Sequence, residues 1–275
     1  MRQHLQGIDH VVVLVRDLDR AQQSYARMGF TLTPRGFHTL GSQNHCLMFG
    51  DDYVELMALP RPHPALRYFS EFLAAGEGLG AVALATDDAH GLQASLAADG
   101  IVADAPLDFS RPVEGLGEAR FRIVQLPPDA SPGCRMFACQ HFTRELVWRA
   151  QYQRHANGAA AIAAIAVVAE DFEAAAARYA KLPAVRAQKI EEGLLVQTGS
   201  APIAIASRWK LGHRLHGVGL PLRSRPLVAA LFVRVADRAA TANVLRRNGL
   251  DPVALADGSF AVSAQDAHGV AVVFG

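Results

Sequence analysis

Two titratable residues of the sequence, His10 and Glu55, lie inside strongly apolar segments. His10 begins the run HVVVLV, and Glu55 lies within YVELMAL. Alternation along a strand places His10 on the same face as Val12 and Leu14, which predicts that its imidazole is buried. A buried polar group without a partner costs roughly 1–3 kcal/mol. Each of the two residues therefore needs a partner, which could be a metal ion or a hydrogen-bonding group.

For Glu55 that partner must carry positive charge, because a buried carboxylate is stable only when it is paired. A metal ion satisfies this requirement, and so would the guanidinium of Arg35, Arg120 or Arg122. For His10 the alternative to a metal is an ordinary hydrogen bond within the core. The residues alone leave both alternatives open.

The composition limits the class of protein. The chain has 275 residues, with 27 Lys and Arg against 26 Asp and Glu, so it lacks the concentrated positive charge of a nucleic-acid-binding protein. Three cysteines without CxxC spacing argue against a disulfide framework. The longest apolar run has 12 residues, at 158–169, whereas a membrane span needs about 20. We expect a cytoplasmic protein without a signal peptide, a membrane partner or a nucleic-acid partner.

The sequence contains one structural unit four times. HVVVLVRDL, AVALATDDA, AIAVVAEDF and LFVRVADRA each join an apolar strand to an acidic residue and a helical stretch. The acidic residues, which we expect to cap the helices, are Asp17, Asp87, Asp171 and Asp237. In three copies a glycine follows the acidic residue by 12 or 13 residues and ends the helix, namely Gly29, Gly100 and Gly249.

Short β-like runs follow each helix, so each unit is predicted to be β-α-β-β-β. In the first copy these runs are FTLTP, HCLMF and YVELMAL. A polar segment at 145–158 separates the second copy from the third. This spacing predicts two domains, 1–147 and 158–275. A doubly wound nucleotide-binding fold is disfavoured, because VRDLDR stands where a glycine-rich fingerprint would be needed.

These repeats resemble the vicinal oxygen chelate superfamily, in particular its glyoxalase-like, four-module members. The most specific segments are RGFHTLGSQNHCLMFGDDYVELM (35–57) and CQHFTRELVWR (139–149). The resemblance implies an α+β fold in which four βαβββ modules pair into two curved mixed-sheet barrels. It also implies a cup that holds a divalent metal, to which a substrate binds through two oxygen atoms.

By this resemblance, the metal ligands are His10 and Glu55 of the first module and His141 at the end of the second. Two histidines and one carboxylate suit Fe, Mn, Zn or Ni and leave positions open for substrate. His141 also forms a helical i, i+4 pair with Glu145, so a contact on a helix surface is the alternative.

Residues near the first strands are expected to bind substrate. By resemblance, His38 and Asn44 line the cup, and Arg35 is a further candidate. The alternative is that Asn44 caps a turn and His38 lies in a loop. His45 has the character of a surface residue. Glu55, if it can leave the metal, could also act as the catalytic base.

The second half has neither His nor Glu at the corresponding positions, so we expect a degenerate barrel without a metal. The whole pattern predicts a metal-dependent lyase or isomerase that acts on a small molecule, as a monomer or homodimer. A metal-free binding protein of the antibiotic-resistance type is the alternative. An extradiol-type dioxygenase is disfavoured, because two-barrel members of that type usually keep their metal in the C-terminal half.

Overall fold

The computed structural model describes residues 5–182, 186–191, 193–222 and 226–275. Its elements follow the β-α-β-β-β order four times. The first unit contains β1 (Ile8–Leu14), α1 (Leu18–Arg27), β2 (Gly36–Phe37), β3 (Gln43–Met48) and β4 (Tyr53–Ala58). After a 3-10 turn, η1 (Pro64–Leu66), and helix α2 (Arg67–Ala75), the second unit contains β5 (Gly78–Ala85), α3 (Ala89–Ala98), β6 (Leu107–Val113), β7 (Gly117–Gln125) and β8 (Arg135–His141).

The second half repeats this arrangement after two 3-10 turns, η2 (Arg144–Leu146) and η3 (Ala150–Tyr152). The third unit contains β9 (Ala159–Val168), α4 (Phe172–Tyr179), β10 (Arg186–Ile190), β11 (Gly193–Gln197) and β12 (Ile203–Ala206), and helix α5 (Arg208–Arg214) follows. The fourth contains β13 (Leu227–Val235), α6 (Arg238–Arg247), β14 (Val253–Ala254), β15 (Phe260–Val262) and β16 (Ala271–Phe274).

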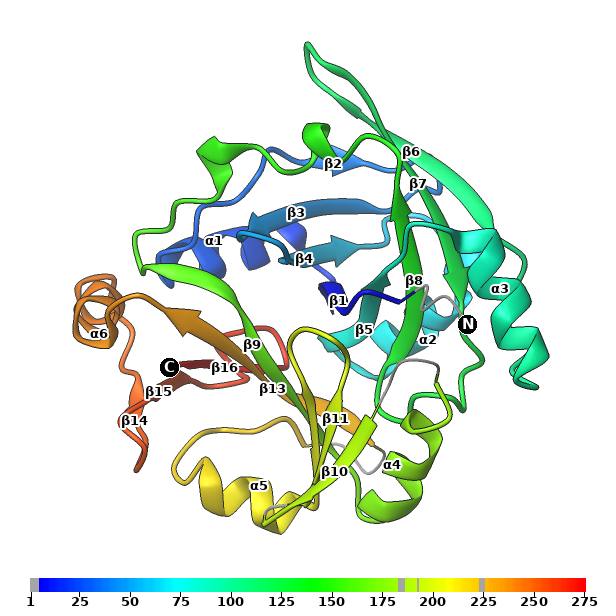
Figure 1. Cartoon of the computed structure of the whole chain (residues 1–275). Helices are drawn as coiled ribbons and strands as arrows, with labels where there is room; N and C mark the ends of the chain where they lie inside the picture. Colours follow the sequence, from blue (N-terminus) through cyan, green and yellow to red (C-terminus); the bar gives the residue numbers. More distant parts are fainter. Residues whose placement is uncertain (1–4, 183–185, 192, 223–225) are drawn as a thin grey trace.

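The strands form two eight-stranded mixed sheets with the same internal order (Figure 1). The first is β2-β3-β4-β1-β5-β8-β7-β6, and the second is β10-β11-β12-β9-β13-β16-β15-β14. In the first sheet β1 is parallel to β4 and antiparallel to β5. The sheet curves until its two edges meet, where the Thr39 amide donates to the Ser110 carbonyl at 2.9 Å. The expected α+β fold with paired βαβββ modules is confirmed, and the first sheet is nearly a closed barrel.

Acidic side chains cap the helices as expected, with one correction. Asp17, Asp171 and Asp237 each accept a hydrogen bond from the amide three residues later. The second unit uses Asp88, which accepts from the Gly91 amide at 2.9 Å, so the prediction of Asp87 was wrong by one residue. Two adjacent aspartates can both supply a cap, and the sequence does not show which one reaches the free amide.

The first β-like run after α1 is also displaced. FTLTP (30–34) was predicted as a strand, but β2 begins only at Gly36. Residues 30–34 still contact the sheet irregularly, because the Thr33 amide donates to the Cys46 carbonyl at 2.9 Å. Pro34 has no amide hydrogen to donate to a neighbouring strand, which weakens regular pairing here.

One apolar cluster extends through both halves of the molecule. It includes Val11 and Val54 of the first sheet together with Ile165 and Val272 of the second. The opposite face of each sheet contributes to a smaller cluster of its own. The predicted boundary lies in the connection between β8 and β9, but the core does not divide there. Within the described residues, no helix is both long and apolar enough to cross a membrane.

Candidate metal centre and substrate pocket

Strand β1 is irregular just before His10. The register of β1 against β5 shifts between Ile8 and His10, so the strand has a bulge at Asp9. A bulge lets adjacent residues reach the same region instead of opposite faces. The Asp9 carboxylate and the His10 imidazole meet as a result, with 2.6 Å between Oδ1 and Nδ1.

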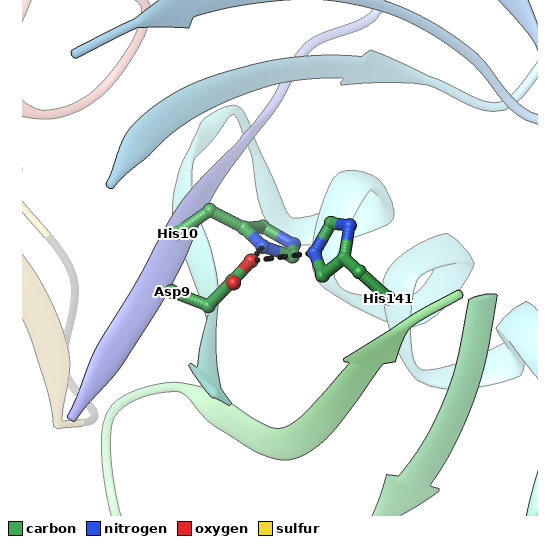
Figure 2. Close-up of side chains that lie close together, drawn as sticks. All are labelled: Asp9, His10 and His141. Atoms are coloured by element: carbon green, nitrogen blue, oxygen red, sulfur yellow. Dashed lines mark hydrogen bonds and ion pairs between the residues drawn. The ribbon is translucent and has the colours of Figure 1, made fainter. Parts of the chain in front are cut away.

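His141, the last residue of β8, reaches the same carboxylate. Its Nε2 lies 3.1 Å from Asp9 Oδ1, and Figure 2 shows both imidazole rings directed at this one oxygen. All three side chains are almost fully buried. In the part of the chain that the structure describes, only these three His, Cys, Asp or Glu residues place ligand atoms within 4.8 Å of one another as a group.

The Asp9 carboxylate is held in its charged form. Burial opposes ionisation, but the hydrogen bonds from His10 and His141 outweigh it and hold the pKa of Asp9 well below its usual range. A buried carboxylate in this state needs compensating positive charge. Arg144 Nη1 lies 4.0 Å from Asp9 Oδ2, and an additional proton on the imidazoles or a metal ion can supply further positive charge.

Glu55 approaches His10 from the other side. Its Oε2 lies 3.7 Å from His10 Nε2, too far for a hydrogen bond. Its Oε1 accepts a hydrogen bond of 2.7 Å from the Asn44 amide. A neutral imidazole has one N–H and can donate to only one of two flanking carboxylates. His10 between Asp9 and Glu55 is therefore a place where a cation would be stabilised.

His38 completes the polar side of the pocket. Its Nδ1 lies 2.8 Å from Ser42 Oγ, and its Nε2 lies 3.4 Å from Asn44 Nδ2 and 3.9 Å from Glu55 Oε1. Burial lowers the pKa of His38 to about 4, with Glu55 opposing this shift. The ring is thus neutral near pH 7. If Asn44 donates to Nε2, the proton is on Nδ1 and is donated to Ser42.

The predicted ligand set is only partly assembled. His10 lies near Glu55, but Glu55 does not belong to the group of ligand atoms that contains His141. The carboxylate in that group is Asp9, which the sequence did not single out as a candidate. The signal was the dipeptide Asp9-His10, which regular alternation would place on opposite faces.

The internal symmetry explains why His141 is not equivalent to Glu55. Ala81 lies seven residues before the cap Asp88, as His10 does before Asp17. Glu55 pairs with Val12, and Phe137 pairs with the corresponding Ala83. In the second module, Ala81 and Phe137 therefore occupy the positions that His10 and Glu55 occupy in the first. His141 lies four residues beyond Phe137.

The pocket beside these groups is mostly apolar. His10, His38, Asn44, Glu55 and Arg111 contribute polar atoms to its lining. Three aromatic residues on the second-module side of the sheet also contribute to it: Phe109, Phe121 and Phe137. The centre of a water-sized molecule has about 50 Å³ available in it, which is more than one water needs.

The structure differs from the expectations that Arg35 binds substrate and that His45 lies at the surface. Arg35 does not line this pocket, since its guanidinium pairs with Asp19 and lies 3.2 Å from Gln43 Oε1. His45 is buried rather than exposed, with its Nδ1 2.7 Å from the Thr33 carbonyl. It faces the side of β3 that packs against the residues before β2. Alternation alone could not show that this side is covered.

The two cysteines that line the pocket, Cys46 and Cys139, are not nucleophiles in this state. Burial raises the pKa of Cys46 to about 12 and that of Cys139 well above its usual value. Both thiols line the pocket as apolar groups.

The donor set at Asp9 fits a divalent transition metal. Two imidazoles and a carboxylate form the combination that such metals prefer when substrate positions stay open. Their oxygen and nitrogen atoms already lie about as far apart as two ligands of one ion. In addition, His141 Nδ1 is buried and has no hydrogen-bond partner among the residues that the structure describes.

Comparison with known proteins agrees with this architecture. The glyoxalase-like domain family matches residues 8–183. A protein of undescribed function from Staphylococcus aureus has 12% identity and a TM-score of 0.71, with 98% of each chain covered. The Mn(II)-bound glyoxalase from Novosphingobium aromaticivorans has 14% identity and a TM-score of 0.59, covering 98% of this chain and 82% of that one.

A variant of 4-hydroxymandelate synthase from Streptomyces coelicolor is also similar, with 14% identity, a TM-score of 0.58, and 90% and 76% of the two chains covered. No curated protein sequence matches the chain. The fold and its repeats define a vicinal oxygen chelate protein, as the sequence resemblance predicted. Within that class, the chain belongs to the glyoxalase-like domain family.

Proposed function

We propose that this protein is a metal-dependent, glyoxalase-like enzyme that acts on a small molecule in the pocket of the first sheet. The observation that carries the proposal is the convergence of Asp9, His10 and His141 on one point, next to a pocket that His10 also lines. These three residues would hold one divalent ion. The family membership and the Mn(II)-bound structural neighbour support this assignment.

The bound metal would act as a Lewis acid towards two substrate oxygens, the chemistry of lyases and isomerases of this kind. Glu55 is placed to act as the base, because it lines the pocket and its Oε2, unlike Oε1, accepts no hydrogen bond from the described residues. Asn44 fixes the orientation of the carboxylate. Glu55 would remove a proton from a carbon next to a substrate carbonyl.

Solvent proton exchange tests this role without requiring knowledge of the product. The protein is loaded with Mn(II), Fe(II), Ni(II) or Zn(II), and small α-hydroxyketones and diketones are monitored by NMR in deuterated water. We expect exchange at the carbon next to the carbonyl, reduced by about 100-fold or more in Glu55→Gln. Glu71→Gln, at an exposed position on α2, is the matched control. Exchange that is unchanged in Glu55→Gln would contradict the assignment.

A second function is favoured by one observation. Ala81 and Phe137, the second-module counterparts of His10 and Glu55, cannot bind a metal. Phe137 instead packs edge-on against His10, with 5.6 Å between the ring centroids. An apolar pocket of this kind would suit a metal-free protein that only binds a small molecule. Ligand binding without proton exchange under every metal would support this second function.

A further inference from the structure

Arg111 is buried at the edge of the pocket, in the middle of β6. Its side chain is only slightly exposed and crosses towards β2, where the two edges of the sheet meet. A Cβ atom on Gly36 would lie 3.1 Å from Arg111 Cδ and 2.3 Å from Asn44 Oδ1. The glycine therefore provides the space through which the arginine reaches the pocket.

The guanidinium has no acidic partner there. Among the described residues, neither a hydrogen bond nor an ion pair holds the Arg111 side chain. Other arginines of the same sheet are paired: Arg122 forms two bonds with Asp108, of 2.6 and 2.8 Å, and Arg135 bonds to Gln125. Burial of a guanidinium without a counter-ion is unfavourable, and the group stays charged at all ordinary pH values.

Glu55 is the carboxylate of the pocket, but it is already engaged. Asn44 donates to its Oε1, and the rings of His10 and His38 approach its two oxygens. Among the described residues, Arg111 forms neither a hydrogen bond nor an ion pair with Glu55. Its charge instead contributes to lowering the pKa of His38. The positive charge of Arg111 is thus left for a ligand.

We propose that Arg111 binds the carboxylate of an acidic substrate, whose apolar part packs on Phe109 and Phe121. These two rings stack on each other at 5.0 Å between centroids, and both line the pocket next to Arg111. A planar guanidinium binds a carboxylate through two parallel hydrogen bonds, which a lysine cannot do. This proposal names the substrate class of the function proposed above and rests on the same pocket.

Phenylacetate and phenylacetamide are suitable probes, because they differ only in the charge of the group that Arg111 would bind. Their binding is measured by calorimetry on the full chain after chelation and again after addition of Mn(II). We expect phenylacetate to bind at least about tenfold more tightly than phenylacetamide in both states, since hydrogen bonds between charged groups are stronger than those to a neutral amide. Phenylphosphonate is the third probe and separates a carboxylate site from a general anion site.

Arg111→Met should abolish the preference for the acid, and Arg111→Lys should retain only part of it. Arg122→Met removes a paired arginine of the neighbouring strand and should leave the preference unchanged. Circular dichroism and thermal unfolding show whether each variant folds. If Arg111→Met does not fold, the comparison of Arg111→Lys with wild type decides.

Any of four results would overturn the proposal. Phenylacetate could bind no more tightly than phenylacetamide or fail to bind. Phenylphosphonate could bind more tightly than phenylacetate, or Arg111→Lys could leave the preference for the acid unchanged. Because the preference is measured without metal as well, its failure is distinct from a failure of the metal-dependent function. A preference that persists after chelation, in a protein that never binds metal, would support Arg111 and contradict the enzyme assignment.

Discussion

His10 uses its two ring nitrogens towards two different acids. Nδ1 contacts Asp9, and Nε2 faces Glu55 across a longer gap. In metal sites, a carboxylate at one nitrogen commonly fixes the ring and raises the affinity of the other for the metal. Asp9 thus orients the His10 ring in addition to serving as a ligand of the proposed site, so its removal should release the metal.

Asn44 is the residue on which the position of Glu55 depends. Asn44→Leu removes the donor to Glu55 Oε1 and leaves a buried carboxylate with one hydrogen bond fewer. We expect a loss of about 1–3 kcal/mol in the free energy of unfolding, measured by urea denaturation. Asn248→Leu, at an exposed helix end, is the control. A loss in Asn44→Leu no larger than in the control would show that this bond does not contribute to stability.

At the scale of elements, a substitution at Gly36 of β2 tests how closely the two edges of the first sheet pack. Gly36→Ala places a methyl group 2.3 Å from Asn44 Oδ1, so Asn44 or β2 must move. We expect a destabilisation of about 1–3 kcal/mol in chemical denaturation. In Gly50→Ala, where a Cβ would meet nothing within 4 Å, the change should stay within about 0.5 kcal/mol. Equal effects of the two substitutions would mean that the edge has room to adapt.

The turn between β3 and β4 carries a second test. Asp52 is buried and accepts a hydrogen bond of 3.0 Å from the Ile162 amide of β9. Burial raises the pKa of Asp52 from 3.8 to about 6, against the effect of that hydrogen bond. Between these two pH values the unfolded chain loses its proton while the folded protein keeps it, so wild-type stability falls as the pH rises.

Asp52→Asn removes this ionisation and can still accept the hydrogen bond. We expect the variant to gain about 1–3 kcal/mol relative to wild type as the pH rises from 3.8 to about 6, and to keep this gain at higher pH. Thermal unfolding at several pH values measures it. A stability difference that does not depend on pH would contradict the raised pKa.

The elements themselves were largely predictable, whereas the site was predictable only in part: His10, His38, Asn44 and Glu55 line the pocket, but Asp9 and Arg111 were not foreseen. Caps such as Asp17 and stops such as Gly29 depend on local chemistry that a sequence displays directly. Asp9 reaches His141 only because of a bulge, and Arg111 reaches the pocket only because β6 closes against β2. These are long-range effects. Arg35 was a candidate within the segment that carries the family resemblance, but its pairing with Asp19 is also long-range and could not be seen from the sequence.

For the whole molecule, the shared apolar cluster predicts that both halves unfold together. His268 reinforces the contact, since its Nδ1 lies 3.0 Å from Glu77 Oε2 and its Nε2 3.0 Å from Ser24 Oγ, both in the first half. Its backbone has φ of 57°, a strained value for a residue other than glycine. The contacts with the first half stabilise this conformation.

His268→Ala should lower the stability of the whole molecule by about 1–3 kcal/mol, because two partly buried polar contacts are lost. Scanning calorimetry should show one transition that moves as a unit, whereas His216→Ala, at an exposed position, should leave it in place. Two separate transitions, of which only one moves, would show that the halves are energetically independent.

The metal content of the purified protein tests the central claim most directly. It is measured by elemental mass spectrometry, without an affinity tag, after reconstitution with Mn(II), Fe(II), Ni(II) or Zn(II). We predict one ion per chain in wild type and its loss in Asp9→Asn, His10→Ala and His141→Ala, while His45→Ala and Glu55→Gln retain it. Wild type without metal, or a His141→Ala variant with its metal intact, would contradict the account.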